Sequence, residues 1–112
     1  MRKEDEQAAQ ECLYAIGHIL EYVEDVRSLD DLISDSRTYD AVMMNFILIG
    51  ESCSRMSDDL KDKLPKIDWR AIKGFRNFLA HDYFGVDKNI LWAAIQFNLP
   101  ELKVELQKMV MD

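Results

Sequence analysis

Residues 3–27 read KEDEQAAQECLYAIGHILEYVEDVR, and this stretch decides the fold class. Its acidic residues fall mainly on one side of a helix, and apolar residues occupy the other. The apolar positions recur at spacings of three and four, which is the period of an amphipathic α-helix: Ala9, Leu13, Ile16, Leu20 and Val23. The pattern predicts a first helix from about Lys3 to Arg27.

The composition of the whole chain agrees with a helical protein. Its 112 residues are 48% hydrophobic, but they include only four Gly and two Pro with which to make turns. That scarcity favours a few long helices over many short strands. We therefore expect a single domain over residues 1–112, with an all-α fold in which four to five helices form an antiparallel bundle.

The next helices follow from apolar spacing and from capping residues. Residues 28–37 should form a polar connection with a short turn, and residues 39–60 a second helix. Gly50 lies inside that helix, where glycine costs about 1 kcal/mol relative to alanine, so we expect it to admit another helix closely. Asp68 should cap a third helix that ends near residues 80–81.

The last part of the chain should contain a turn and two short helices. We expect Gly85 to take the left-handed conformation in the turn that follows the third helix. Asp87 should cap the next helix, and Pro100 should end it. A capping box formed by Asn98 and Glu101 should then start a final helix.

The two cysteines and the hydropathy pattern indicate the compartment. Cys12 and Cys53 lack the spacing of a metal site and lie among apolar neighbours, so we expect them to be reduced and packed in the core. The sequence shows no signal peptide and no apolar run of about 18 residues. We expect a cytoplasmic protein without a membrane segment and without a cofactor.

Charge is unevenly distributed along the chain. The net charge is −7, which by itself argues against a nucleic-acid partner. Residues 61–76, however, contain six basic and two acidic side chains, whereas the rest of the chain carries −11. Lys66, Arg70 and Lys73 from this window form a candidate patch for RNA phosphates. Charge alone fits a solvated helix end and loop equally well.

Residues 76–83, which read RNFLAHDY, concentrate the chemistry of the chain. Arg76 can bind a phosphate through a bidentate fork, and His81 can transfer a proton near neutral pH. These are the groups that cleavage of RNA without metal needs, because the ribose 2′-OH must be deprotonated and a charged phosphorane stabilised. The alternative is structural: a helix terminus at which Arg76 pairs with Asp82 and Tyr83 packs.

Helical geometry limits how Arg76 and His81 act together. They lie five positions apart, which separates them by about 140° on a regular helix. Either the helix ends near His81 and its ring turns, or two copies of the chain build a shared site across a two-fold axis. The second solution predicts a homodimer with the third helix near the axis. Glu51 either orients a basic group of this cluster or simply points to solvent.

The segments around the cluster resemble the HepT-like toxins, within the wider HEPN group of helical ribonucleases. Arg76, Asn77, His81 and Tyr83 fit the Arg-x4-His-x-Tyr motif of that family. Other segments that look like the family are WRAIKGFRN before His81, DYFGVD after it, the Ile-Gly-Glu that ends at Glu51, and Leu-Pro-Glu-Leu in the last helix. The resemblance covers nearly the whole chain and implies a HEPN-like bundle.

The resemblance implies a metal-independent endoribonuclease that acts as the toxin of a type VII-like toxin–antitoxin pair. Arg76 and His81 would be catalytic at a homodimer interface. Asn77, and Asp82 next to His81, would support the site. The implied substrate is RNA, including tRNA. The implied antitoxin is a nucleotidyltransferase of the MNT type that adds adenylate to Tyr83, so that the new anionic group blocks the phosphate site and competes for Arg76.

A second function, of another class, fits the same sequence. The chain could be a non-catalytic subunit of a minimal nucleotidyltransferase, presenting a nucleotide or a substrate to its partner. Its acidic surface suits a basic partner under both interpretations. Experiment separates the two functions, because only an enzyme has an RNA-cleaving activity to lose when Arg76 or His81 is replaced.

Overall fold

A computed structural model describes residues 1–110 and confirms the predicted all-α class. Within these residues the regular structure is entirely helical, with no strand. The elements are α1 (Lys3–Tyr22), α2 (Leu29–Ser34), α3 (Ser36–Ser54), α4 (Asp58–Asp62), α5 (Trp69–His81), the 3-10 turn η1 (Tyr83–Gly85), α6 (Lys88–Ala93), the π-helical segment η2 (Ala94–Asn98) and α7 (Leu99–Val110).

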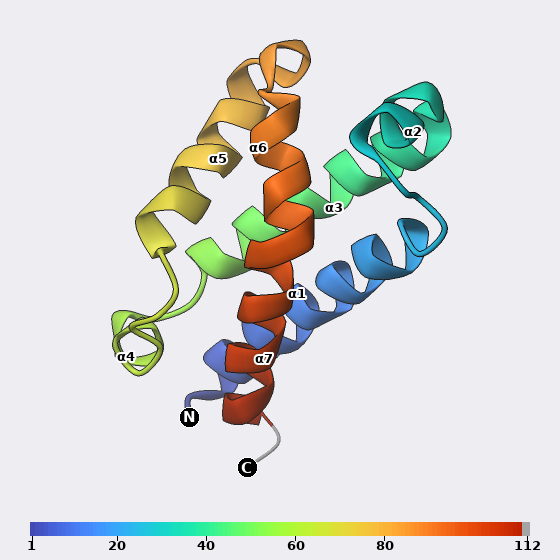
Figure 1. The fold of residues 1–112 in the computed structure, drawn as a ribbon. Helices are drawn as coiled ribbons and strands as arrows, with labels where there is room; N and C mark the ends of the chain where they lie inside the picture. Colours follow the sequence, from blue (N-terminus) through green and yellow to red (C-terminus); the bar gives the residue numbers. More distant parts are fainter. Residues whose placement is uncertain (111–112) are drawn as a thin grey trace.

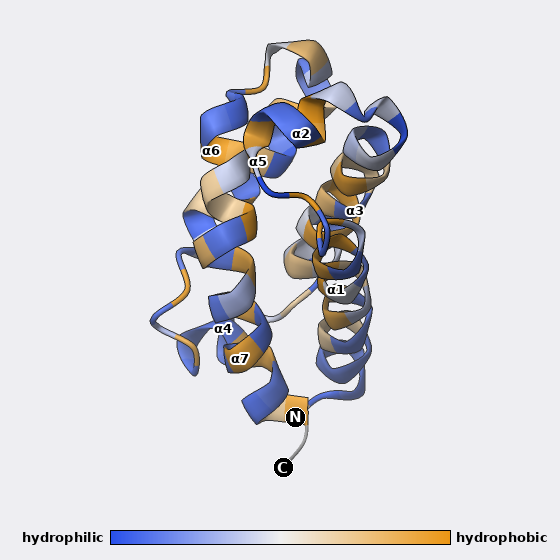
Figure 2. Cartoon of the chain, turned by 45° about the vertical axis from the view of Figure 1, so that its right-hand side comes forward, coloured by the Kyte–Doolittle hydropathy of each residue, from blue (hydrophilic) through white to orange (hydrophobic). Residues whose placement is uncertain are grey.

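The long helices pack around a common core (Figure 1). α1 and α3 lie side by side, and α5 packs on α3. α6, η2 and α7 follow one another as a continuous column, of which α7 packs on α1. Hydrophobic and hydrophilic segments alternate along these helices, as expected of amphipathic elements (Figure 2). α3 is therefore the element that connects α1 to α5.

The core consists of aliphatic side chains from most of these helices. Ile16, Ile19, Met43, Leu91 and Leu106 are completely shielded from solvent. Burial of each such side chain stabilises the fold by about 1.5–3 kcal/mol. The predicted amphipathic stripe of the first helix thus faces the interior.

α1 is shorter than predicted, because it ends at Tyr22 rather than at Arg27. Its last turn contains no basic residue, and Glu24 and Asp25 follow after the C-cap residue Val23. Negative charge at a helix C-terminus opposes the helix macrodipole, so continuing the helix through these acids is unfavourable.

The segment after α1 is more helical than predicted. Residues 28–37, expected as a connection, contain α2, which Ser28 caps by accepting a hydrogen bond from the N–H of Asp31 (3.1 Å). α3 then begins at Ser36 instead of residue 39. A serine cap of this kind satisfies one of the free N–H groups at a helix start, which makes even a short helix favourable.

The helix predicted over residues 39–60 is divided in two by a contact with α1. α3 ends at Ser54, and Ser57 begins α4 as its cap. The carboxylate of Asp5 on α1 accepts hydrogen bonds from the backbone N–H (2.8 Å) and the hydroxyl (2.5 Å) of Ser57. These bonds hold the chain in the non-helical conformation that separates α3 from α4.

Pro100 does not end a helix, contrary to expectation. It is the second residue of α7, and the segment before it, η2, is π-helical. A wider turn accommodates the proline ring, which would clash with the preceding turn of a regular α-helix. It also tolerates the missing N–H of the proline. The expected capping box at Asn98 and Glu101 therefore does not form, because Asn98 lies inside continuous helical structure.

Candidate active site

α5 carries the candidate residues and is anchored at its start. Asp68 caps the helix, as predicted, by accepting a hydrogen bond from the N–H of Ala71 (3.0 Å). The indole N–H of Trp69 donates to the carbonyl oxygens of Lys61 (3.2 Å) and Leu64 (3.3 Å). α5 runs to His81, so the predicted third helix is confirmed at both ends.

Gly50 brings α5 close to α3, as the sequence predicts. A Cβ atom at Gly50 would lie 2.5 Å from both Cβ and Cγ of Arg76. No larger residue fits there unless α5 moves. The absence of a side chain at Gly50 therefore determines where the Arg76 stem begins.

The guanidinium of Arg76 is held by two side chains. Its Nε–H and a terminal nitrogen both donate to Oε1 of Glu51, at 2.8 and 2.7 Å, and its other terminal nitrogen donates to Oδ1 of Asn77 at 3.3 Å. Glu51 thus orients Arg76 instead of only facing solvent. The alternative pairing of Arg76 with Asp82 is wrong. Each terminal nitrogen keeps a further N–H with which to meet a phosphate.

His81 is the last residue of α5, and its side chain is exposed. Because α5 is regular up to this point, the directions of Arg76 and His81 differ by about 140°. Among residues 1–110, no hydrogen bond joins the His81 ring to Arg76 or to any other group. A single chain therefore leaves the two candidate catalytic groups on different sides of α5.

Asp82 and Gly85 form the tight turn after α5. The Asp82 carboxylate caps η1 by accepting a hydrogen bond from the N–H of Gly85 (3.0 Å). The left-handed conformation predicted for Gly85 is wrong, since its φ is not positive. The glycine is needed for space instead, because a Cβ there would collide with the Asp82 carboxyl group.

The Tyr83 hydroxyl points to α3. It donates a hydrogen bond to Oδ1 of Asp40 (2.7 Å), and the Tyr83 side chain is half-buried. Burial, together with the hydrogen bond and the negative charge of Asp40, raises the pKa of the Tyr83 phenol. Asp40 is not predicted by the sequence, because it lies 43 positions away and no local feature marks it.

Several of the basic residues surround one cavity. A hollow of about 430 Å³ between the C-terminal end of α3, α4 and α5 is lined by Lys61, Arg70, Lys73 and Arg76. Two of the three predicted patch residues, Arg70 and Lys73, are therefore placed beside Arg76. Lys66 does not line this cavity. Lys61, which is not part of the predicted patch, does line it.

Lys66 lies near α7 instead. The ion pair with Lys108, and more distantly the charge of Lys66, lower the pKa of Glu105. Lys61 lines the cavity where Lys66 was expected. Its ammonium lies over the Trp69 ring, 5.8 Å from the ring centroid. The basic residues that line this cavity therefore come from α4 and α5.

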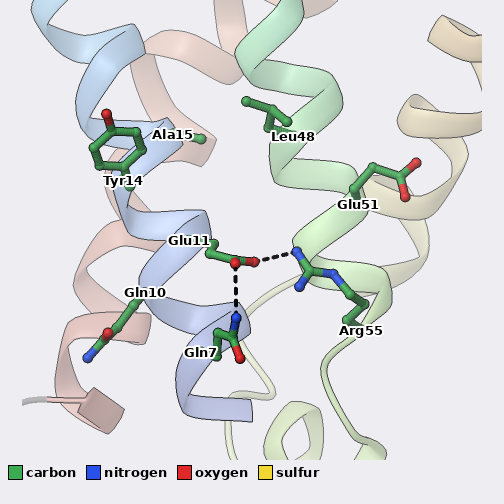
Figure 3. Close-up of a pocket in the computed structure, with 8 residues that line it drawn as sticks. All are labelled: Gln7, Gln10, Glu11, Tyr14, Ala15, Leu48, Glu51 and Arg55. Atoms are coloured by element: carbon green, nitrogen blue, oxygen red, sulfur yellow. Dashed lines mark hydrogen bonds and ion pairs between the residues drawn. The ribbon is translucent and has the colours of Figure 1, made fainter. Parts of the chain in front are cut away.

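A second cavity, the α1–α3 hollow, opens between these two helices (Figure 3). It measures about 580 Å³ and is lined by Gln7, Gln10, Glu11, Tyr14, Ala15, Leu48, Glu51 and Arg55. The ion pair between Arg55 and Glu11 (2.6 Å) crosses it. Glu51 borders both this hollow and Arg76, so the hollow adjoins the candidate site.

The described residues form neither a metal site nor a helix that could span a membrane. Residues 1–110 contain no group of three or more His, Cys, Asp or Glu side chains that could hold a metal ion. None of their helices combines the length and the apolar character needed to cross a bilayer.

Comparison with known proteins identifies the family. The "Ribonuclease HepT-like" family matches residues 12–109. The chain belongs to this family, and the predicted resemblance is confirmed. No solved structure matches the chain.

Individual relatives match over nearly the full length of the chain. A probable ribonuclease HepT of Thermococcus cleftensis is 30% identical over 109 residues, covering 97% of this chain and 98% of that protein. A candidate RNase of Methanocaldococcus jannaschii is 29% identical over 108 residues, covering 96% and 98%. Another, from Caldanaerobacter subterraneus, is 30% identical over 105 residues, covering 94% and 89%.

Proposed function

We propose that this protein is a cytoplasmic, metal-independent endoribonuclease and the toxin of a toxin–antitoxin pair. One observation carries the proposal: Glu51 and Asn77 hold Arg76 at the edge of a cavity lined with further cations, on the same helix as an exposed histidine. The family and the names of the relatives support RNA as the substrate. Arg70, Lys73 and Lys61 would bind flanking phosphates.

The chemistry needs only a proton carrier and a cation. His81 takes the proton of a ribose 2′-OH, whose oxygen forms a bond to the adjacent phosphorus. The P–O5′ bond breaks, and the leaving oxygen receives a proton. Arg76 stabilises the charge that develops on the phosphorane oxygens. General acid–base catalysis of this kind contributes about 10²–10⁴-fold in rate.

We further propose that the complete site forms in a homodimer. Arg76 and His81 lie on different sides of one α5, so a second copy would supply the missing group. The exposed apolar residues Tyr14, Met44 and Leu48 on α1 and α3 offer a surface for that copy. Because Glu51 lines the adjoining α1–α3 hollow, a copy seated there would lie beside Arg76.

The proposed regulator is an MNT-type nucleotidyltransferase antitoxin that adds adenylate to Tyr83. The motif position of Tyr83, two residues after His81, supports this assignment. The charge of −11 outside residues 61–76 suits a basic protein partner. The substrate RNA would include tRNA.

Purified protein tests the proposal directly. Its intact mass must first show that Tyr83 carries no added group. Incubation with total tRNA in excess EDTA should then yield cleaved products. Arg76→Ala and His81→Ala should each reduce the rate by at least about 100-fold. Absence of cleavage by the unmodified protein would contradict the proposal that it is an endoribonuclease and would favour a non-catalytic binding subunit.

Matched variants control for loss of structure. Arg2 forms an exposed ion pair with Asp59 (2.9 Å), so Arg2→Ala removes an arginine–carboxylate ion pair outside the candidate site. His18 packs between Tyr14 and Tyr22 on α1, with ring centroids 4.2 and 5.6 Å away. His18→Gln and Arg2→Ala should both retain activity. Sedimentation of wild type and Leu48→Glu tests the dimer, which the added charge should dissociate.

A further inference from the structure

The tie between Tyr83 and Asp40 joins the end of α5 to the first half of α3. The Tyr83 hydroxyl donates to Oδ1 of Asp40 at 2.7 Å. The neighbouring Phe84 is 90% exposed and contributes little to holding this turn. Tyr83 therefore adds a polar tie to the packing of the buried Leu79 and Val86 on either side of η1, and so helps to fix the helix end that carries His81.

We infer that Asp40 is a positioning residue: through Tyr83 it holds His81 in place, and modification of the Tyr83 hydroxyl lowers the activity of the protein by breaking this tie. The inference rests on the proposed function, and it concerns how the same site is regulated. It assigns a role to a residue on α3 that the Arg-x4-His-x-Tyr motif does not contain.

The geometry separates this mechanism from direct masking of Arg76. Asp40 and Glu51 lie on the same helix, α3, and mark where Tyr83 and Arg76 meet it. Their positions differ by eleven residues, or about 16 Å along the helix axis. A phosphate attached to the Tyr83 oxygen is thus placed beside Asp40, at a distance from the guanidinium. The tie is the first contact that the modification must change.

The covalent chemistry makes the break obligatory. When a nucleoside triphosphate modifies Tyr83, the phenol oxygen forms a bond to the α-phosphorus, and the bond to the departing pyrophosphate breaks. The phenol proton is lost, and the Asp40 carboxylate is already in place to accept it. The ester oxygen that results has no proton to donate. Its phosphate is also negatively charged and is repelled by Asp40.

Substitutions that break the tie without adding a phosphate test the inference. Tyr83→Phe removes the donor, and Asp40→Ala removes the acceptor. Each should lower kcat for tRNA cleavage about fivefold to tenfold, the factor expected of one solvent-exposed hydrogen bond, with KM changed less than about twofold. The double variant should be no worse than either single variant.

A conservative variant and two controls sharpen the comparison. The amide oxygen of Asp40→Asn can still accept the hydrogen bond, so this variant should recover most of the lost kcat. Tyr22→Phe on α1 and Asp25→Ala after α1 remove the same groups from places outside the site, and both should match wild type. A kcat for Tyr83→Phe equal to that of wild type would overturn the inference.

A readout without RNA separates this inference from the proposed function. Amide hydrogen exchange of residues 79–85 should be about fivefold to tenfold faster in Asp40→Ala and Tyr83→Phe than in wild type, while α1 is unaffected. If wild type cleaves no RNA, the proposed function fails, and exchange still decides whether the tie holds the helix end. Unchanged exchange in both variants would refute the tie.

Discussion

Arg76 and Glu51 meet through a single carboxylate oxygen, to which two guanidinium nitrogens donate at 2.8 and 2.7 Å. The arginine side chain is 31% exposed and the glutamate 49%. The pair lies at the border between the cavity of basic residues and the α1–α3 hollow. Its main effect is therefore to aim Arg76, since a pair this exposed contributes little to stability.

Glu51→Ala should impair cleavage without unfolding the protein. Arg76 loses its fixed direction, and a small misplacement of a catalytic group is costly, so we expect kcat to fall by about tenfold or more. Steady-state kinetics with tRNA measures this change. Asp59→Ala, which removes the acid of the exposed pair with Arg2, should leave kcat unchanged. Wild-type kcat in Glu51→Ala would show that Arg76 does not need this partner.

Gly50→Ala should destabilise the fold, although alanine is the better helix former. The added Cβ would lie 2.5 Å from Cβ and Cγ of Arg76. Overpacking of this kind costs about 1–3 kcal/mol, against a gain in helix propensity of about 1 kcal/mol. We expect a net loss of up to about 2 kcal/mol in the free energy of unfolding, measured with urea.

Two other helical glycines provide the control for Gly50. A Cβ at Gly17 on α1 or at Gly74 on α5 would meet no atom within 4 Å. Gly17→Ala and Gly74→Ala should therefore stabilise the protein by about 0.5–1 kcal/mol. Equal stabilisation by all three alanines would disprove the close contact at Gly50.

Asp5→Asn should make the free energy of unfolding less dependent on pH in the acidic range. Burial alone would raise the pKa of Asp5, but the hydrogen bonds from Ser57 outweigh it and hold the pKa below its usual value. The stabilisation is thus complete above the unfolded-state pKa of about 3.9 and is lost as the pH falls through the folded-state pKa.

Urea unfolding at two pH values measures the effect. At about pH 6, the Asp5→Asn variant should be less stable than wild type by about 1–2 kcal/mol, the range for a disrupted buried hydrogen bond. At about pH 2.5, below the unfolded-state pKa, the difference should narrow, because proton binding to Asp5 in the unfolded state removes part of the stabilisation. The exposed neighbour Glu4 serves as control in Glu4→Gln. A gap of the same size at both pH values would contradict the prediction.

Cys12 and Cys53 should react with thiol reagents only when the protein unfolds. Both are buried, with the sulfur atoms 3.8 Å apart on α1 and α3. The contact with Cys12 and burial raise the pKa of Cys53, which keeps its thiol protonated and unreactive. Ellman's reagent should therefore label native protein at the rate of opening and label guanidinium-unfolded protein at once. Rapid labelling of native protein would show that the thiols are accessible.

Local patterns in the sequence correctly predicted the elements that depend on near neighbours. α5 begins after Asp68 because the carboxylate caps an N–H three positions on, and α6 follows Asp87 for the same reason. The stripe of apolar residues in α1 faces the core. The Arg-x4-His-x-Tyr spacing placed the chain in its family.

Where the sequence misled, a contact over a long distance or an unusual turn decided the outcome. Nothing near Ser57 in the sequence shows that Asp5 breaks the helix there. Pro100 is a strong local signal for a helix end, yet the π-helical segment before it lets the column continue. Gly85 was correctly marked as special, but for the wrong reason, because space and not φ requires it.

The amino-acid sequence by itself determined the helical class and the residues capable of catalytic chemistry. Helix period, caps and motif spacing are each encoded within a few neighbouring positions. The partners of those residues came from the tertiary structure. Glu51 lies 25 positions from Arg76, and Asp40 lies 43 positions from Tyr83. Both acids belong to α3, and only the packing of α5 on that helix brings them to the side chains that they hold.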